Sequence, residues 1–312
     1  MRHRAAIVGL GRVGMLFDED PKRSRVWTHF TAYERLADRF DLVAVCDPDA
    51  DRLAAAAARR PGVRTFAALD ELLDADPVDV VSICTPIALH AEQVEACAPQ
   101  VRAIVCEKPL SADAASAERA SAACAAATTL LAVNYYKRFE SAVQVVHRLV
   151  NDGVLGDVRA ATALYSGPFD AVGSHAVDLL HFLLGPLEVT AAAGGSALLR
   201  FGALGSAALV QTGPREDLVF EVDVIGSEGR ARVLDNCDRI KVSRFAASPR
   251  YEGYRELAGV SSSDETAEPF LLLFTEVADV LDGKRAQMTS DAAGALGTQR
   301  ILDAIQSRVR QP

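Results

Sequence analysis

Residues 5–14 read Ala-Ala-Ile-Val-Gly-Leu-Gly-Arg-Val-Gly, and this stretch decides the fold class. A short apolar run is followed directly by three glycines with GxGxxG spacing. The first glycine permits a tight turn, the second lets the backbone approach a pyrophosphate, and the third allows close packing against the next helix. An ordinary glycine turn is the alternative, but the apolar run in front favours a dinucleotide site. The candidate cofactor-binding residues of this loop are Gly9, Gly11, Arg12, Val13 and Gly14.

The first half of the chain alternates such apolar runs with longer helical segments. Runs without polar alternation are typical of strands buried on both faces, and the helical segments supply the crossovers that parallel strands require. We therefore expect a doubly wound parallel sheet, the Rossmann arrangement, over residues 1–133. The runs are Ala5 to Val8, Leu42 to Cys46, Val63 to Phe66, Val78 to Cys84, Ala103 to Cys106 and Leu130 to Val133.

A carboxylate, Asp47, ends the second apolar run, where it would accept hydrogen bonds from ribose hydroxyls and repel a 2′-phosphate. It lies 33 residues after the last glycine, and the polar segment 18–25, which contains a proline, accounts for the excess as an insertion that interrupts the first crossover helix. This loop either covers the site or is an ordinary solvated loop. We expect NAD as the cofactor, with NADP left open because Arg12 or Arg52 could reach a phosphate.

The second half, residues 134–312, has a different pattern. Helices are expected at about 139–150 and 174–184, and short glycine-punctuated strand candidates run from about 187 to 245. An exposed loop over 246–268 and two helices, about 269–281 and 291–309, complete the chain. This pattern predicts an α+β domain with a mostly antiparallel open sheet, and the last helices are candidates to pack back on the first domain.

Composition excludes several classes of function. The chain has 33 Lys and Arg against 42 Asp and Glu, so its net charge of −9 disfavours nucleic acid as a partner. No run reaches the roughly 18 apolar residues of a membrane-spanning helix. The basic start resembles a secretory signal, but glycines break the apolar run and no cleavage site follows, so we expect a cytoplasmic protein. Six cysteines without CxxC spacing predict buried free thiols and no metal site.

Further polar groups follow the fourth, fifth and sixth runs, at the carboxyl edge where open α/β sheets bind ligands. A last group opens a helix in the second half. The groups are Cys84-Thr85-Pro86 with His90, Cys106-Glu107-Lys108-Pro109, Asn134 to Phe139, and Gly173 to Asp178.

With these elements in this order, the chain resembles the family of glucose–fructose oxidoreductase and inositol dehydrogenase. The resemblance covers nearly the whole chain, and its most specific part is the combination of EKP at 107–109 with HxxD at 175–178. It implies hydride transfer between NAD(P) and a hydroxyl or carbonyl carbon of a sugar, cyclitol or nucleotide-sugar-like compound. It also implies a homodimer or homotetramer formed through the open sheet of the second domain.

The resemblance makes Lys108 and His175 the catalytic pair. A partly desolvated lysine near a cationic nicotinamide has its pKa lowered toward the useful range, and an unperturbed histidine titrates near 6.5. A surface lysine paired with Glu107 and a structural histidine are the alternatives. Asp178, one helical turn after His175, could orient it. Thr85, Pro86, His90 and Glu107 are candidates to contact the cofactor, with Pro86 as a plain helix start as the alternative. Tyr136, Lys137, Arg138 and Asp170 are candidates for substrate binding or catalytic support, with packing at the domain junction as the alternative for Tyr136.

One departure from the family pattern leaves the reaction open. The family often carries an aspartate four residues before its histidine, but this chain has Ala171 there, with Asp170 one residue away. Redox-neutral chemistry, in which NAD is reduced and reoxidised within one cycle, as in epimerisation, elimination or glycoside cleavage, is the second hypothesis. A non-catalytic dinucleotide sensor is the third. His29, after the inserted loop, matches a feature of a subgroup of the family and is a further candidate for the cofactor side.

Overall fold

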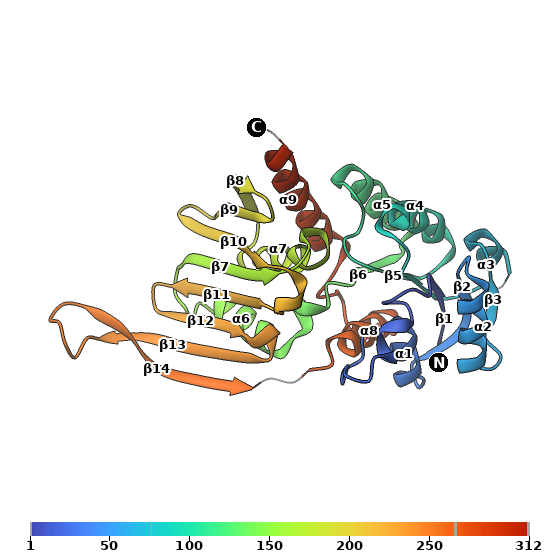
Figure 1. Cartoon of the computed structure of the whole chain (residues 1–312), viewed down its shortest axis with the longest axis horizontal. Coiled ribbons are helices and arrows are strands. Elements are labelled where there is room, and N and C mark those ends of the chain that lie inside the picture. Colours follow the sequence, from blue (N-terminus) through green and yellow to red (C-terminus); the bar gives the residue numbers. More distant parts are fainter. Residues whose placement is uncertain (1, 76, 265–266, 311–312) are drawn as a thin grey trace. The chain divides into compact units, whose positions relative to one another are not determined.

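The computed structural model describes residues 2–75, 77–264 and 267–310, which form two compact units (Figure 1). The first unit comprises Met1–Tyr136 and Glu268–Gln299, and the second comprises Lys137–Ala267 and Arg300–Pro312. The chain therefore returns to the first unit after completing the sheet of the second. No helix in the described part of the chain is long and apolar enough to cross a membrane.

The first unit contains a six-stranded sheet in which every pairing is parallel, with strand order β3-β2-β1-β4-β5-β6. Its central strands consist of apolar residues that are fully buried, as expected for a sheet covered on both faces. The predicted doubly wound parallel sheet is confirmed. The strands are β1 (His3–Val8), β2 (Phe40–Cys46), β3 (Arg64–Phe66), β4 (Val80–Ile83), β5 (Ala103–Cys106) and β6 (Leu130–Val133).

Helices connect these strands, and local capping sets where two of them begin. The Asp49 side chain accepts the backbone N–H groups of Asp51 and Arg52 at the start of α2, and Asp113 accepts that of Ser116 at the start of α5. Such N-caps satisfy backbone donors that have no partner within the helix. The helices are α1 (His29–Arg35), α2 (Ala50–Arg59), α3 (Leu69–Ala75), α4 (Ile87–Cys97), α5 (Ala114–Ala127) and the short η2 (Ala98–Gln100).

The inserted segment interrupts the first crossover helix, as the sequence predicted. A helical turn begins at Gly11, whose carbonyl accepts the N–H of Met15, and the chain then leaves it through η1 (Leu16–Glu19). Helix α1 resumes where this turn stopped, because the N–H of His29 donates to the carbonyl of Val13 at 3.0 Å. The insertion is therefore a loop that leaves and re-enters one helical path.

Helix α8 (Pro269–Leu281) belongs to the first unit and packs on α1. Phe274 contacts the rings of His29 and Tyr33 edge-to-face at 5.2 and 5.0 Å between centroids. At the other end of α8, Arg39 pairs with Asp279 at 2.7 Å. Aromatic packing and ion pairing together attach this late segment to α1 and to Arg39 after it. Helix α9 (Ala292–Arg310) follows, and the boundary between the two units falls within it.

The second unit contains an eight-stranded sheet with order β14-β13-β12-β11-β7-β10-β9-β8. All its pairings are antiparallel except that of β7 with β10, which agrees with the predicted mostly antiparallel sheet. Alternate residues of its strands pack against α6 (Ser141–Asn151) and α7 (Ser174–Leu184) in one apolar core. The strands are β7 (Val158–Ser166), β8 (Leu187–Ala193), β9 (Ser196–Phe201), β10 (Gly205–Gly213), β11 (Phe220–Gly226), β12 (Gly229–Leu234), β13 (Arg239–Ala247) and β14 (Arg255–Asp264).

Short helical turns occupy the connections, including η3 (Tyr136–Phe139), η4 (Phe169–Gly173), η5 (Arg215–Asp217) and η6 (Asp235–Cys237). The expectation of one exposed loop over 246–268 was wrong, because β14 forms an edge strand that pairs with β13 (Figure 1). Nearly all its residues are exposed, so it has no alternation of apolar and polar residues to reveal it. Main-chain hydrogen bonding to β13 defines this strand, and Arg239 of β13 also pairs with Asp264 of β14 at 3.0 Å.

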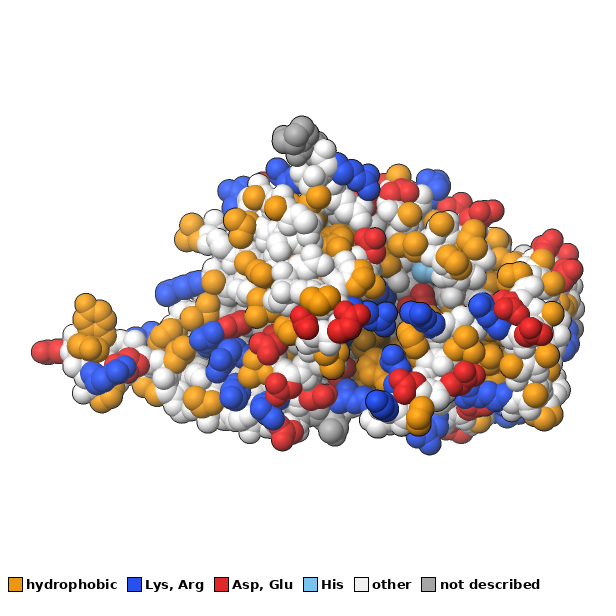
Figure 2. Space-filling model, in the orientation of Figure 1, with side chains coloured by type: hydrophobic (Ala, Val, Ile, Leu, Met, Phe, Trp, Pro, Cys, Tyr) orange, Lys and Arg blue, Asp and Glu red, His pale blue; other side chains and the backbone are white. Residues whose placement is uncertain are grey.

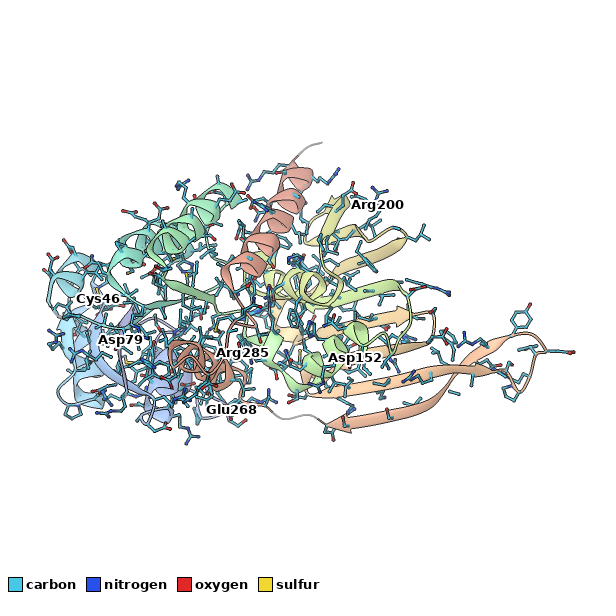
Figure 3. All side chains as sticks on the ribbon, turned by 180° about the vertical axis from the view of Figure 1, so that it is seen from behind. Cys46, Asp79, Asp152, Arg200, Glu268 and Arg285 are labelled. Atoms are coloured by element: carbon cyan, nitrogen blue, oxygen red, sulfur yellow. The ribbon has the colours of Figure 1, made fainter. Side chains whose placement is uncertain are left out.

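All six cysteines are buried and unbonded to one another, which confirms the prediction of free buried thiols. Burial raises the pKa of Cys84 and Cys106 well above the ordinary thiol value. Cys46, labelled in Figure 3, ends β2 directly before Asp47.

Candidate active site

The glycine loop after β1 is built for a close approach of another molecule to the backbone. Gly9 has a φ of +94°, and a Cβ there would lie 2.7 Å from the Cys84 carbonyl carbon. A Cβ on Gly14 would lie 2.0 Å from the Gly9 carbonyl oxygen. At Gly11, by contrast, a Cβ would meet no described heavy atom within 4 Å. Packing explains the first and third glycines, and the second borders open space, as a pyrophosphate cradle requires. The loop therefore fits a bound dinucleotide.

Asp47 joins the end of β2 to the glycine loop. Its carboxylate accepts the backbone N–H of Leu10 at 2.7 Å and that of Asp49 at 2.9 Å, and it is 3% exposed. Arg52 lies 3.5 Å from Asp47 and 3.3 Å from Asp49. Asp47 thus shapes the loop that would receive the cofactor, with one arginine beside it. Arg12 is exposed on the loop itself, and Val13 is half-buried.

His90 connects the loops that follow β4 and β5. One ring nitrogen lies 2.8 Å from the Thr85 carbonyl oxygen and the other 2.9 Å from that of Pro109, and the residue is 2% exposed. Pro86 is the N-cap residue of α4, and Thr85 donates its hydroxyl to Gln93 at 2.6 Å. His90 therefore connects the loop after β4, at Thr85, with the loop after β5, at Pro109.

Lys108 follows β5 at the carboxyl edge of the parallel sheet and is half-buried. Glu107 before it is 8% exposed and accepts hydrogen bonds from His29 at 3.0 Å, Asn134 at 2.5 Å and the backbone N–H of Lys108 at 3.3 Å. Burial by itself would raise the pKa of the Glu107 carboxyl, but the hydrogen bonds from His29 and Asn134 and the nearby positive charges outweigh burial and lower it. Glu107 is thus an anion held inside the first unit.

His175 is the second residue of α7, is 5% exposed, and lies in the second unit. The sequence predicted that Asp178 could orient it and that Arg138 could bind an anion. The structure joins these two residues to each other: Arg138 donates to Asp178 at 2.6 and 2.9 Å, and their side chains are 3% and 1% exposed. The Arg138 guanidinium also lies 5.1 Å from the ring centroid of Phe182. Asp178 therefore holds Arg138 beneath the surface of the second unit.

The remaining substrate candidates have different surroundings. The Lys137 amine is 3.2 Å from Asn236 Oδ1 and 4.1 Å from the Phe220 ring centroid, and the residue is 4% exposed. Asp170 accepts a hydrogen bond from Gln306 at 3.0 Å. Tyr136, in the first unit, contacts the ring of Trp27 at 5.4 Å between centroids.

The sequence offered His29 as a candidate for the cofactor side and Asn134 as part of a longer motif, but it did not show that both contact Glu107. No periodicity or spacing relates His29, on α1, to Glu107, 78 residues later. A buried acid after a strand is the one signal that could have prompted a search for donors around Glu107.

The first unit has the features of a Rossmann-type nucleotide-binding fold. These are the glycine loop, the buried carboxylate Asp47 at the end of a strand, and the half-buried Lys108 at the carboxyl edge of a parallel sheet. Residues 3–135 match the family described as "Oxidoreductase family, NAD-binding Rossmann fold". Over these residues the chain is similar to this NAD-binding oxidoreductase family, in agreement with the motifs of its sequence.

Two curated relatives and one solved structure are similar to the chain. The D-apiose dehydrogenase of Paraburkholderia graminis is 32% identical over 173 residues, covering 50% of this chain and 46% of that protein. The inositol 2-dehydrogenase of Rhizobium meliloti is 31% identical over 210 residues, covering 62% and 59%. The matches thus span about half the length of these relatives. The WlbA dehydrogenase of Bordetella pertussis, solved with NADH and UDP-GlcNAcA, shares the fold, with a TM-score of 0.81, 23% identity and coverage of 100% and 97%.

Proposed function

We propose that the protein is an NAD-dependent oxidoreductase that interconverts a hydroxyl and a carbonyl group on a sugar, cyclitol or nucleotide-sugar-like substrate. One observation carries the proposal most: half-buried Lys108 stands at the carboxyl edge of the sheet whose first loop borders open space at Gly11. The similar proteins support the substrate class, because their names refer to a branched sugar, a cyclitol and a nucleotide sugar.

In this proposal NAD supplies the hydride acceptor or donor, and the chain supplies the proton transfer. Lys108 takes the proton from the substrate hydroxyl during oxidation, or returns it during reduction. A lysine is suited to this work when it is partly removed from water, as Lys108 is. We assign His175 as the second proton-transfer residue, acting from the second unit.

The other assignments follow the chemistry of each residue. We propose that the glycine loop, with Arg12 and Val13, binds the pyrophosphate and that Asp47 selects NAD over NADP by repelling a 2′-phosphate. Glu107 and the loop held by His90 border the nicotinamide end. In the substrate unit, Lys137 binds hydroxyl or anionic groups directly, whereas Arg138 acts through its pair with Asp178. The remaining cofactor and substrate assignments are Gly9, Gly11, Gly14, Thr85, Pro86, Tyr136 and Asp170.

We further propose that residues 1–133 bind the dinucleotide and that residues 134–312 bind substrate and form a homodimer or homotetramer through the open sheet. On the face of this sheet away from α6 and α7, Asp223 of β11 lies opposite Arg232 of β12 and forms an ion pair with Arg230. Glu221 and Arg232 on the same face carry charges that can pair with their opposites on a second copy related by a twofold axis.

Light scattering tests the assembly. Arg232→Glu should lower the molar mass, while Arg148→Glu, an exposed arginine on α6, should leave it unchanged. An unaltered mass for Arg232→Glu would remove this face from the proposal.

We place the protein in the cytoplasm, without nucleic-acid partners. The face shown in Figure 2 has acidic and basic side chains interspersed, so it does not present the basic surface that a phosphate backbone requires. The net charge of −9 also disfavours binding to a phosphate backbone.

The test of the main proposal is turnover by purified protein across sugars, cyclitols and nucleotide sugars with NAD or NADH. Lys108→Met should lower kcat by about a hundredfold or more with little change in cofactor affinity. Lys284→Met, a solvent-exposed lysine of the same unit, is the matched control. Turnover that survives Lys108→Met would refute the catalytic assignment, and failure to bind either dinucleotide would refute the function.

Redox-neutral use of NAD is a second candidate, favoured by Ala171 at the position where the family often carries aspartate. It predicts substrate conversion without net change in NADH absorbance. Substrate deuterated at the reacting carbon distinguishes the two: a redox-neutral cycle returns the label to product, whereas net oxidation leaves it on the cofactor.

A further inference from the structure

The Glu107 carboxylate is surrounded by groups that donate hydrogen bonds to it. The recorded donors come from three places in the first unit: His29 on α1, Asn134 after β6, and the backbone of Lys108. An ionised carboxylate only accepts hydrogen bonds, so it suits the backbone N–H of Lys108, the Asn134 amide and the Nε2–H tautomer of His29 at the same time. The surroundings of Glu107 in the first unit therefore favour the ionised carboxylate.

Each donor is held in place by the fold. The N–H of Asn134 donates to the Cys106 carbonyl at 2.8 Å, which extends the pairing of β6 with β5 by one residue and sets the Asn134 side chain beside Glu107. His29 is 0% exposed and packs against Phe270 and Phe274 of α8 at 5.5 and 5.2 Å between ring centroids. The arrangement of donors around Glu107 therefore depends on α1, on the paired strands β5 and β6, and on α8.

The direction of the His29 hydrogen bond follows from chemistry. Nε2 must carry the hydrogen, because the carboxylate oxygen 3.0 Å away cannot donate. Nδ1 is buried with no hydrogen-bond partner among the described residues. Asn134 Oδ1 is likewise without a recorded partner, consistent with its amide being oriented to donate.

Among the residues that the structure describes, two thiols, one histidine and one lysine interact electrostatically with Glu107. Cys84 from the end of β4 and Cys106 from β5 face it, and burial raises the pKa of both thiols so that they stay neutral. His29 faces it from α1, and Lys108 is the neighbouring cation. The positive charge of Lys108 lowers the pKa of Glu107, and by reciprocity the Glu107 anion stabilises the protonated form of Lys108.

We propose that His29 and Asn134 are positioning residues that hold Glu107 as a buried anion, and that this anion favours the protonated form of Lys108. The inference rests on the proposed function for its meaning: a protonated lysine is ready to donate a proton in carbonyl reduction, and oxidation then requires a higher pH. The effect of Glu107 on the ionisation of Lys108 can be measured without any substrate.

The chain has only five lysines, at positions 22, 108, 137, 241 and 284, which makes Lys108 observable by itself. In protein labelled with 13C at lysine Cε, Lys108→Arg identifies the Lys108 signal by its loss. Titration of that signal with pH gives the ionisation midpoint of Lys108 without cofactor or substrate. Glu107→Gln should lower this midpoint by about 1 to 2 pH units. The Lys241 and Lys284 signals should not move.

The His29 variants test the positioning role. His29→Leu removes the donor and should lower the Lys108 midpoint in the same direction but by less, whereas His29→Gln, which can donate from its amide, should restore it. Tyr33→Phe is the control, because Tyr33 is a buried residue of the same helix whose hydroxyl contacts Ser82 at 2.8 Å. It should leave the midpoint unchanged.

Equal Lys108 midpoints in wild type and Glu107→Gln would overturn the proposal. If Glu107→Gln does not fold, equal midpoints in His29→Leu and His29→Gln would overturn it instead. A shift in Tyr33→Phe as large as in His29→Leu would assign the effect to packing and would also overturn it. Failure of the turnover screen with a normal Glu107→Gln shift would refute the enzymatic function while leaving the charge relation standing.

Discussion

Removal of one partner from the buried Arg138–Asp178 pair should strongly destabilise the second unit. The two groups make two hydrogen bonds of 2.6 and 2.9 Å, and their side chains are 3% and 1% exposed. Asp178→Ala leaves a guanidinium buried without its counter-ion, which costs about 3 to 5 kcal/mol. At about 3 °C per kcal/mol for a unit of this size, the melting temperature should fall by about 9 to 15 °C.

The same unit offers a matched control. Arg200, labelled in Figure 3, pairs with Glu188 at the same shortest distance of 2.6 Å, but these side chains are 62% and 64% exposed. Because water screens an exposed pair, Arg200→Ala should cost at most about 1 kcal/mol. Replacement of both buried partners, as Arg138→Met with Asp178→Leu, should recover most of the loss because neither charge of the pair is then left buried without the other.

Differential scanning calorimetry checks all three variants, and urea unfolding at 25 °C gives the free energies directly. Equal melting temperatures for Asp178→Ala and Arg200→Ala would refute the reasoning from burial. A double variant no more stable than Asp178→Ala would show that the pair is not replaceable by packing, and that the loss had another cause than a stranded charge.

Three further predictions concern the first unit. Gly11→Ala should leave the melting temperature nearly unchanged but weaken NADH binding about tenfold, whereas Gly14→Ala should destabilise the unit by about 1 to 3 kcal/mol, since its Cβ would lie 2.0 Å from the Gly9 carbonyl oxygen. NADH titration and thermal melts check both, and equal melts for the two variants would contradict this. Asp47→Ser should move the ratio of NAD to NADP affinity toward NADP by about tenfold, about 1.4 kcal/mol, and an unchanged ratio would refute the selectivity argument. Because the Glu107 pKa is below its ordinary value of 4.5, its contribution to stability is complete above that pH and is lost as pH falls below it. The decline in melting temperature from about pH 5 to 3 should therefore be shallower in Glu107→Gln, and superimposable declines would contradict this.

The strands of the first unit could be predicted almost to the residue. β5 and β6 begin and end where their apolar runs do, because a strand buried on both faces must be apolar throughout. Helix α7 was equally readable, since glycines flank it on both sides. β14 was missed because an exposed edge strand needs only main-chain partners, and those leave no pattern in its side chains.

The sequence predicted which residues belong to the candidate site, but it did not predict which of them contact one another. Lys108 and Glu107 follow a strand, and any parallel sheet brings such residues to its carboxyl edge. His90 was expected at the cofactor, but its ring nitrogens are taken up by the carbonyls of Thr85 and Pro109. Sequence spacing carries no information about contacts between residues that are far apart in the chain and adjacent in space.

The sequence by itself determined the Rossmann class of the first unit, the location of the glycine cradle and the identity of the candidate lysine, because each depends on local periodicity or on conformations that only glycine adopts. Tertiary structure decided which charges are buried together. It joined Arg138 to Asp178 and set His29 against Glu107, and burial turned these ordinary polar residues into strongly coupled pairs because water no longer screens them.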